Sequence, residues 1–158
     1  NVTITNDSGG EVTLGAGGSA DWCAPVLSIA AVDLPKSGVA NAISAIEGKV
    51  FAGTGENASG VSYATVSVGN TNPPIASVSS TFNGYKTNGI FGEANYAYLA
   101  TDNNAKEIEI VNLTTNPYVE AGFFNAPGNG NGDSIFVAGS VGYMASADKF
   151  YTFDLNHC

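Results

Sequence analysis

Arginine is absent from this chain, and its five lysines are outnumbered by fourteen acidic residues, which gives a formal net charge of −9. A surface of this sign repels phosphate backbones and anionic lipid headgroups, so we expect no nucleic-acid partner. No run of apolar residues is long enough for a membrane span. The sequence also starts without a charged and apolar leader, so we expect that a secreted form lost its signal before residue 1.

Histidine and cysteine are equally scarce. His157 is the only histidine, and Cys23 and Cys158 are the only cysteines. A single histidine at the end of the chain makes a Ser-His-Asp relay or a histidine metal cluster hard to build. Glu107 and Glu109 share a face of an expected strand, where a glycosidase could place its carboxylates, but we favour the solvated side of an amphipathic strand. The sequence therefore predicts a protein that is not an enzyme.

What the chain does contain is a segment that recurs three times, at a spacing of roughly 45 residues. The copies begin at Ile43, Ile90 and Ile135, and eight positions later each has an aromatic residue, namely Phe51, Tyr98 and Tyr143. Each copy then continues into a second strand, with apolar residues at every second position of residues 62–68, 107–113 and 149–155. We therefore expect an all-β fold of three antiparallel repeats, each of the size of a propeller blade.

The third copy is shorter than the other two. In the first two copies a proline turn leads to a third strand that ends at Phe82 or Phe124, whereas the chain ends at Cys158 before the third copy reaches this strand. Residues 23–34 have the form of the missing outer strand, so we infer that the N-terminal strand completes the last repeat and brings Cys23 close to Cys158. The chain then divides into an N-terminal strand extension, residues 1–22, and a three-repeat β-propeller-like domain, residues 23–158.

Three segments of the second copy carry a likeness to known proteins: residues 95–102 (NYAYLATD), residues 107–113 (EIEIVNL) and the pair Asn116-Pro117. In these segments the sequence resembles the LVIVD-repeat family of bacterial and archaeal surface proteins, and the resemblance extends over residues 24–158. It implies β-propeller blades and an extracellular or cell-surface location. The family has no catalytic motif that could be transferred to this chain.

Three repeats are too few for an ordinary propeller, which closes with about four to eight blades. The alternatives are a small closed ring, a larger ring of two chains, or a filament in which the N-terminal strand of one chain completes the last repeat of its neighbour. Residues 1–22 contain two short alternating strands, which either join such an assembly or cover an edge of their own domain. The residues expected at an assembly contact are Val2, Ile4, Val12, Leu14 and Trp22. Trp22 would otherwise stack on a sugar or cover a disulfide.

Four Asn-x-Ser/Thr acceptors for glycans occur, at Asn57, Asn112, Asn1 and Asn6. Asn57 lies in a glycine-flanked loop and is the best placed, although a chain rich in Asn, Ser and Thr also carries such triplets by chance. We expect no cofactor. The loops at residues 102–104 and 129–133 hold oxygen atoms that Ca²⁺ could use, but neither has EF-hand spacing and both serve equally well as turns.

These observations favour a non-catalytic structural subunit of an extracellular assembly, such as a filament, a pilus-like fibre or a surface layer. Its partners would be copies of itself, joined by strand exchange, and covalent glycans. The alternative is a secreted β-propeller binding module that recognises a carbohydrate or a protein.

We predict that Cys23 and Cys158 form a disulfide in the native protein, because the repeat brings them together and an extracellular setting is oxidising. Thiol titration and mass measurement before and after reduction test this. Free thiols should be found only after reduction, and two free thiols in the unreduced protein would contradict the prediction.

Overall fold

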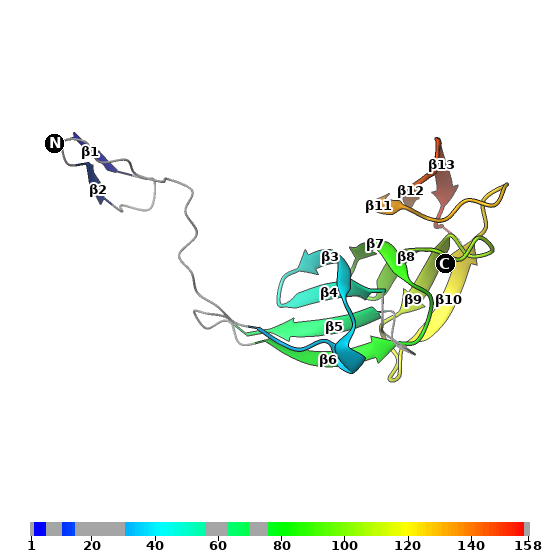
Figure 1. The fold of residues 1–158 in the computed structure, drawn as a ribbon, viewed down its shortest axis with the longest axis horizontal. Helices are drawn as coiled ribbons and strands as arrows, with labels where there is room; N and C mark the ends of the chain where they lie inside the picture. The colour runs from blue at the N-terminus through cyan, green and yellow to red at the C-terminus, as the bar shows by residue number, and fades with distance from the viewer. Residues whose placement is uncertain (1, 6–10, 15–30, 56–62, 70–75, 157–158) are drawn as a thin grey trace.

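The computed structural model describes residues 2–5, 11–14, 31–55, 63–69 and 76–156 (Figure 1). In these residues the regular elements are β-strands, apart from one short 3-10 helix, η1 (Pro35–Ser37). The prediction of an all-β fold is therefore confirmed. No helix in the described part of the chain is long and apolar enough to cross a membrane.

Three antiparallel sheets follow one another along the chain, one for each sequence repeat. Sheet 1 consists of β3 (Ala40–Ile46), β4 (Lys49–Thr54), β5 (Tyr63–Val68) and β6 (Ala76–Phe82). Sheet 2 consists of β7 (Thr87–Gly92), β8 (Tyr96–Thr101), β9 (Ile108–Asn112) and β10 (Val119–Phe124). Sheet 3 consists of β11 (Ser134–Ala138), β12 (Val141–Ser146) and β13 (Lys149–Asp154). Within each sheet every strand pairs with its neighbours in sequence, so the alternation of apolar residues predicts the strands correctly.

A separate hairpin precedes the three sheets. Strands β1 (Val2–Thr5) and β2 (Glu11–Leu14) pair antiparallel, with Val2 opposite Leu14 and Ile4 opposite Val12. The two short N-terminal strands are therefore predicted correctly. Trp22 lies outside the described residues.

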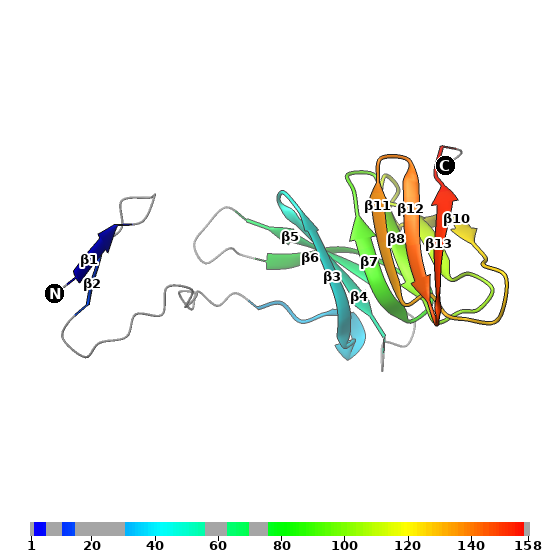
Figure 2. The same cartoon turned by 90° about the horizontal axis from the view of Figure 1, so that it is seen from above.

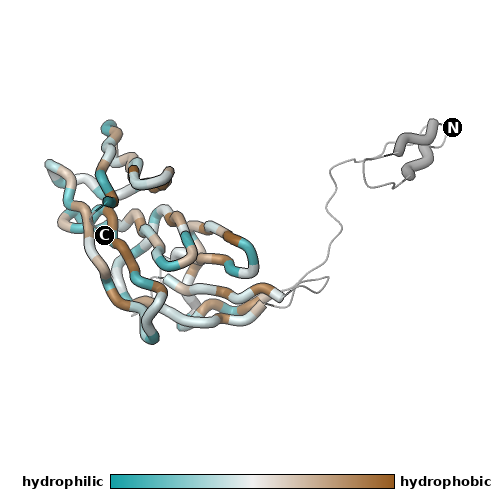
Figure 3. The backbone as a smooth tube through the Cα atoms, turned by 180° about the vertical axis from the view of Figure 1, so that it is seen from behind, coloured by the Kyte–Doolittle hydropathy of each residue, from teal (hydrophilic) through white to brown (hydrophobic). Residues whose placement is uncertain are grey.

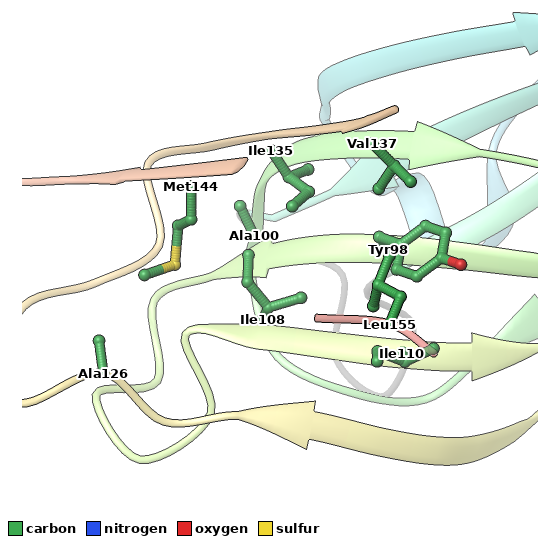
Figure 4. Close-up of a cluster of buried hydrophobic side chains, with 9 residues drawn as sticks. All are labelled: Tyr98, Ala100, Ile108, Ile110, Ala126, Ile135, Val137, Met144 and Leu155. Atoms are coloured by element: carbon green, nitrogen blue, oxygen red, sulfur yellow. The ribbon is translucent and has the colours of Figure 1, made fainter. Parts of the chain in front are cut away.

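Sheet 2 lies between sheets 1 and 3 (Figures 1 and 2). Its central strands β8 and β9 are buried on both faces, since residues at consecutive positions of each strand are buried, whereas the outer strand β10 is largely exposed. The cluster between sheets 1 and 2 contains Phe51, Tyr63, Phe82, Ile90, Ala97, Leu99, Val111 and Leu113. The cluster between sheets 2 and 3 contains Tyr98, Ala100, Ile108, Ile110, Ala126, Ile135, Val137, Met144 and Leu155 (Figure 4). The hydrophobic stretches that form these clusters lie along the strands (Figure 3).

Gly92 sets how closely sheets 1 and 2 approach each other. A Cβ atom added at Gly92 would lie 2.3 Å from two atoms of the Phe51 ring, whereas one added at Gly122 in β10 would have no atom within 4 Å. Neither glycine has a positive φ angle, so space alone distinguishes the two positions.

We predict that Gly92→Ala destabilises the protein by about 1–3 kcal/mol, because the new methyl group must push the Phe51 ring out of a packed interface. Urea unfolding measures the change. Gly122→Ala is the matched control and should alter the free energy of unfolding by no more than about 0.5 kcal/mol. Equal effects at the two positions would show that the contact of Gly92 with Phe51 is unimportant.

Candidate functional site

The outer edge of sheet 3 is open in the described residues. β5 and β9 each pair with a fourth strand, β6 and β10, whereas β13 pairs with β12 alone. An open strand edge presents unpaired N–H and C=O groups, which are a template for an added strand. It is also the edge at which the sequence predicts a strand from elsewhere in the chain.

The described part of the chain does not bring its own N-terminal segment to this edge. Residues 23–30 lie outside the described residues, and residues 31–34 are not in a strand. Both views place residues 31–34 close to sheet 1, at the far side of the three sheets from β13 (Figures 1 and 2). Cys23 and Cys158 lie outside the described residues, so their disulfide stays a prediction.

Of the four glycan acceptors, Asn112 lies in the described residues and Asn57, Asn1 and Asn6 do not. Asn112 is the last residue of β9 and is half-buried. Its Oδ1 accepts hydrogen bonds from the backbone N–H of Thr114 at 2.8 Å and from Thr114 Oγ1 at 2.7 Å. The side chain of Asn112 is thus already used to hold a turn, and glycosylation stays a prediction at all four positions.

Side chains of the two oxygen-rich loops accept hydrogen bonds from backbone N–H groups. Asn103 Oδ1 accepts a hydrogen bond from the N–H of Ala105 at 2.9 Å, and Asp133 Oδ2 accepts one from the N–H of Ala147 at 2.7 Å. No group of three or more acidic, histidine or cysteine side chains that could hold a metal ion comes together among the described residues. The first loop is thus a turn held by Asn103, and the second is tied by Asp133 to the turn between β12 and β13.

Glu107 and Glu109 are not on a solvated face, so our interpretation of them is wrong. Their exposed fractions are 0% and 2%. The reason is that sheet 2 is covered on both faces, so a polar residue in β9 has no solvated side. Glu107 Oε2 accepts a hydrogen bond from the N–H of Ala126 at 3.0 Å, and its Oε1 has no hydrogen-bond partner.

Glu109 belongs to a charged cluster with Glu120 of β10 and Lys106. Lys106 Nζ is ion-paired to Glu120 Oε2, and it also lies 4.9 Å from the centre of the Phe123 ring. The cluster lines a hollow of about 410 Å³ whose other wall is formed by Phe82, Asn83, Gly84 and Tyr85. Sequence reasoning missed Glu120 and Lys106, since their proximity to Glu109 depends on how β9 and β10 pair.

Burial raises the pKa of Glu109 to about 7, and the hydrogen bond with Glu120 and the charge of Glu120 act in the same direction. Partial burial would also raise the pKa of Glu120, but its hydrogen bonds with Lys106 and Glu109 outweigh this effect and lower it. Near neutral pH the carboxyl group of Glu109 therefore gains and loses a proton while Glu120 stays ionised. The two carboxyl groups of a glycosidase lie about 5–9.5 Å apart around the sugar, whereas these two share a hydrogen bond.

We predict that Glu109 makes the protein less stable as the pH rises from about 4.3 to 7. The unfolded chain loses this proton near pH 4.3, whereas the folded protein keeps it to about 7. Between these values the folded state binds more protons, so the free energy of unfolding falls with pH, by roughly 2 kcal/mol in total. The stabilisation is complete below about pH 4.3 and lost above about pH 7. Glu109→Gln should remove this fall, because an amide does not titrate.

Urea unfolding across this pH range, on the wild type and on the variant, measures the difference between the two curves. Glu47→Gln is the control, since Glu47 is an exposed carboxylate in the turn between β3 and β4. Its curve should run parallel to that of the wild type. If the Glu109→Gln curve does so as well, Glu109 has an ordinary pKa and the prediction is wrong.

The chain was also compared with known proteins. No family model matches it, and no curated protein matches it. The function has to be argued from the arrangement of the sheets and of their edges.

Proposed function

We propose that this protein is a non-catalytic structural subunit of an extracellular assembly, whose copies are joined by strand exchange into a filament, a pilus-like fibre or a surface layer. The observation that carries the proposal is the outer edge of β13: in the described residues no fourth strand pairs with it, whereas each of the two other sheets has one. The chain also has strand-forming residues, in β1 and β2, that belong to none of the three sheets.

In this proposal each sheet is a blade of the propeller type, in line with the resemblance to the LVIVD-repeat family. Two features support it. The strands of each sheet pair in chain order, and the first strands of the three sheets, β3, β7 and β11, lie next to one another. Three blades are fewer than the four or so that the smallest ordinary ring contains, so the molecule keeps two free ends.

The added strand comes from a neighbouring copy. Residues 31–34 run close to sheet 1, on the side of the three sheets opposite β13 (Figures 1 and 2). In a row of subunits that side meets the open edge of the next copy. Pairing of backbone groups then supplies the affinity, and a head-to-tail contact that does not close on itself yields a polymer.

Strand exchange also changes what the predicted disulfide connects. If residues 23–34 of one copy complete sheet 3 of the next, Cys23 of the first copy lies near Cys158 of the second. The bond would then link neighbouring subunits covalently. Glycans at the four acceptor asparagines would complete the proposed extracellular subunit.

A second candidate function is a secreted binding module. The hollow beside Glu109 favours it, because it combines an aromatic side chain, Tyr85, with a few polar groups, as binding sites for small ligands do. Such a module would exist as discrete particles, whereas a structural subunit forms polymers.

We predict that deletion of residues 1–20 leaves a folded subunit that no longer polymerises. The three sheets lie outside the deleted segment and keep both of their apolar clusters, while the strands available for exchange are reduced. Electron microscopy and sedimentation of the deleted and full-length proteins, with circular dichroism to confirm folding, provide the measurement.

Filaments that persist after this deletion would exclude the hairpin as the connector and leave residues 23–34 as the donor strand. Deletion of residues 1–34 then tests whether any N-terminal strand connects the subunits, since it removes every N-terminal donor strand. A full-length protein that remains monomeric at high concentration contradicts the structural function and favours the binding module.

A further inference from the structure

The two outer sheets of the row each leave one apolar face without a partner sheet. Sheet 2 covers the face of sheet 1 that carries Phe51 and the face of sheet 3 that carries Ile135. The opposite faces of sheets 1 and 3 are called here the first end face and the last end face. Two of the large apolar side chains that are exposed in the described residues lie on them: Ile43 on the first and Phe150 on the last. Phe136 is also exposed, but its ring packs edge-on against Phe91 of sheet 2, with 5.1 Å between the ring centres.

The last end face repeats the surface that sheets 1 and 2 each present to the following sheet. The strand registers make Phe51 equivalent to Tyr98 and Tyr143, and Tyr63 equivalent to Ile108 and Phe150. Phe51, Tyr63 and Ile108 are fully buried and Tyr98 nearly so, whereas Phe150 is 67% exposed. The rings of Phe51 and Tyr63 stack at 6.4 Å, and those of Tyr143 and Phe150 stack at 6.0 Å. The same pair of rings is therefore fully buried in sheet 1, whereas in sheet 3 Tyr143 is half-buried and Phe150 is exposed.

The first end face repeats the surface that sheets 2 and 3 each present to the preceding sheet. Ile43, Ile90 and Ile135 occupy equivalent positions, opposite Ala52, Leu99 and Met144 in their respective hairpins. Ile90 is 8% exposed and Ile135 is 9% exposed, because a preceding sheet covers each of them, whereas Ile43 is 74% exposed. Ala52 of β4 and Ala64 and Val66 of β5 lie on the same face and are already buried, so the open part of this face is confined to β3, around Ile43.

The two end faces are thus the two halves of one interface, and this interface occurs twice inside the chain. A second copy of the chain brings the complementary half to each of them, and no other partner has to be invoked. Large exposed apolar patches of this kind mark contact surfaces in soluble proteins. Two copies placed in this way would bring six sheets together, which lies within the range of about four to eight blades for closed propellers.

We propose that sheet 3 of one copy packs face to face against sheet 1 of another copy, with Tyr143 and Phe150 covering Ile43. The contact is heterologous, since the two copies use different surfaces. The inference rests on the proposed function in that the chain associates with itself. It uses sheet faces rather than a strand edge, however, so either contact can exist without the other.

A photoreactive benzoylphenylalanine at position 150 of the full-length chain tests the contact. Mixing chains of two isotopic labels separates crosslinks between copies from those within one copy. We expect a crosslink between copies that joins position 150 to residues 39–46, identified by mass spectrometry of the peptides. Ile43→Lys in the same chain should reduce its yield at least about tenfold, because a charge then faces the aromatic rings.

Val119→Lys is the matched control, since Val119 is an exposed apolar residue on the outer strand of sheet 2 and on neither end face. It should leave the yield within about twofold of the parent. No crosslink to residues 39–46, or an equal yield with Ile43→Lys, would overturn the inference. Deletion of residues 1–34, which removes every N-terminal donor strand, separates the two proposals: a crosslink that survives the loss of polymers supports the face contact, and polymers of the full-length chain without the crosslink leave strand exchange alone.

Discussion

The structure depends on the double-sided burial of sheet 2. A sheet whose strands are apolar at consecutive positions can leave water only when another sheet covers each of its faces. Sheets 1 and 3 provide this cover, with Phe51 on one side and Met144 on the other. Three sheets that pack in a row always leave two end faces, however. These end faces carry the same residue types as the sheet faces that are buried between the sheets. The free surfaces of the molecule are therefore a direct consequence of the way its core is built.

Burial of sheet 2 also explains why the pKa of Glu109, in β9, is raised. Glu109 points into an interface between sheets because β9 has no solvated face, and its charge is therefore costly. The neighbouring Glu120 adds to this cost, while Lys106 keeps Glu120 itself ionised. Protonation of Glu109 removes both the cost of burying its charge and its repulsion by Glu120. The stability of the contact between sheets 1 and 2 is thereby coupled to pH near neutrality.

Much of the fold follows from sequence alone, because a period of two residues marks a strand and the recurrence of Ile43 and Phe51 marks three equivalent hairpins. The burial of Glu107 and Glu109 did not follow, since alternation within one strand shows that it has two faces but not that both are covered. The adjacent apolar residues Ile110 and Val111, which point to opposite faces, contained a hint of this. The proximity of Glu109 to Glu120 could not be predicted from the sequence, because the β9–β10 ladder changes register at a bulge between Glu120 and Gly122.

The open edge of β13 and the two end faces differ in physical kind. The edge offers backbone hydrogen bonds in the plane of the sheet, whereas the faces offer apolar area perpendicular to that plane. A subunit can therefore use both at once without competition for the same atoms. Face contacts add sheets along the row, and an exchanged strand adds width at the outer side of one sheet. In the proposed assembly both contacts would therefore act at the same joint, between the sheet 1 side of one copy and sheet 3 of the next.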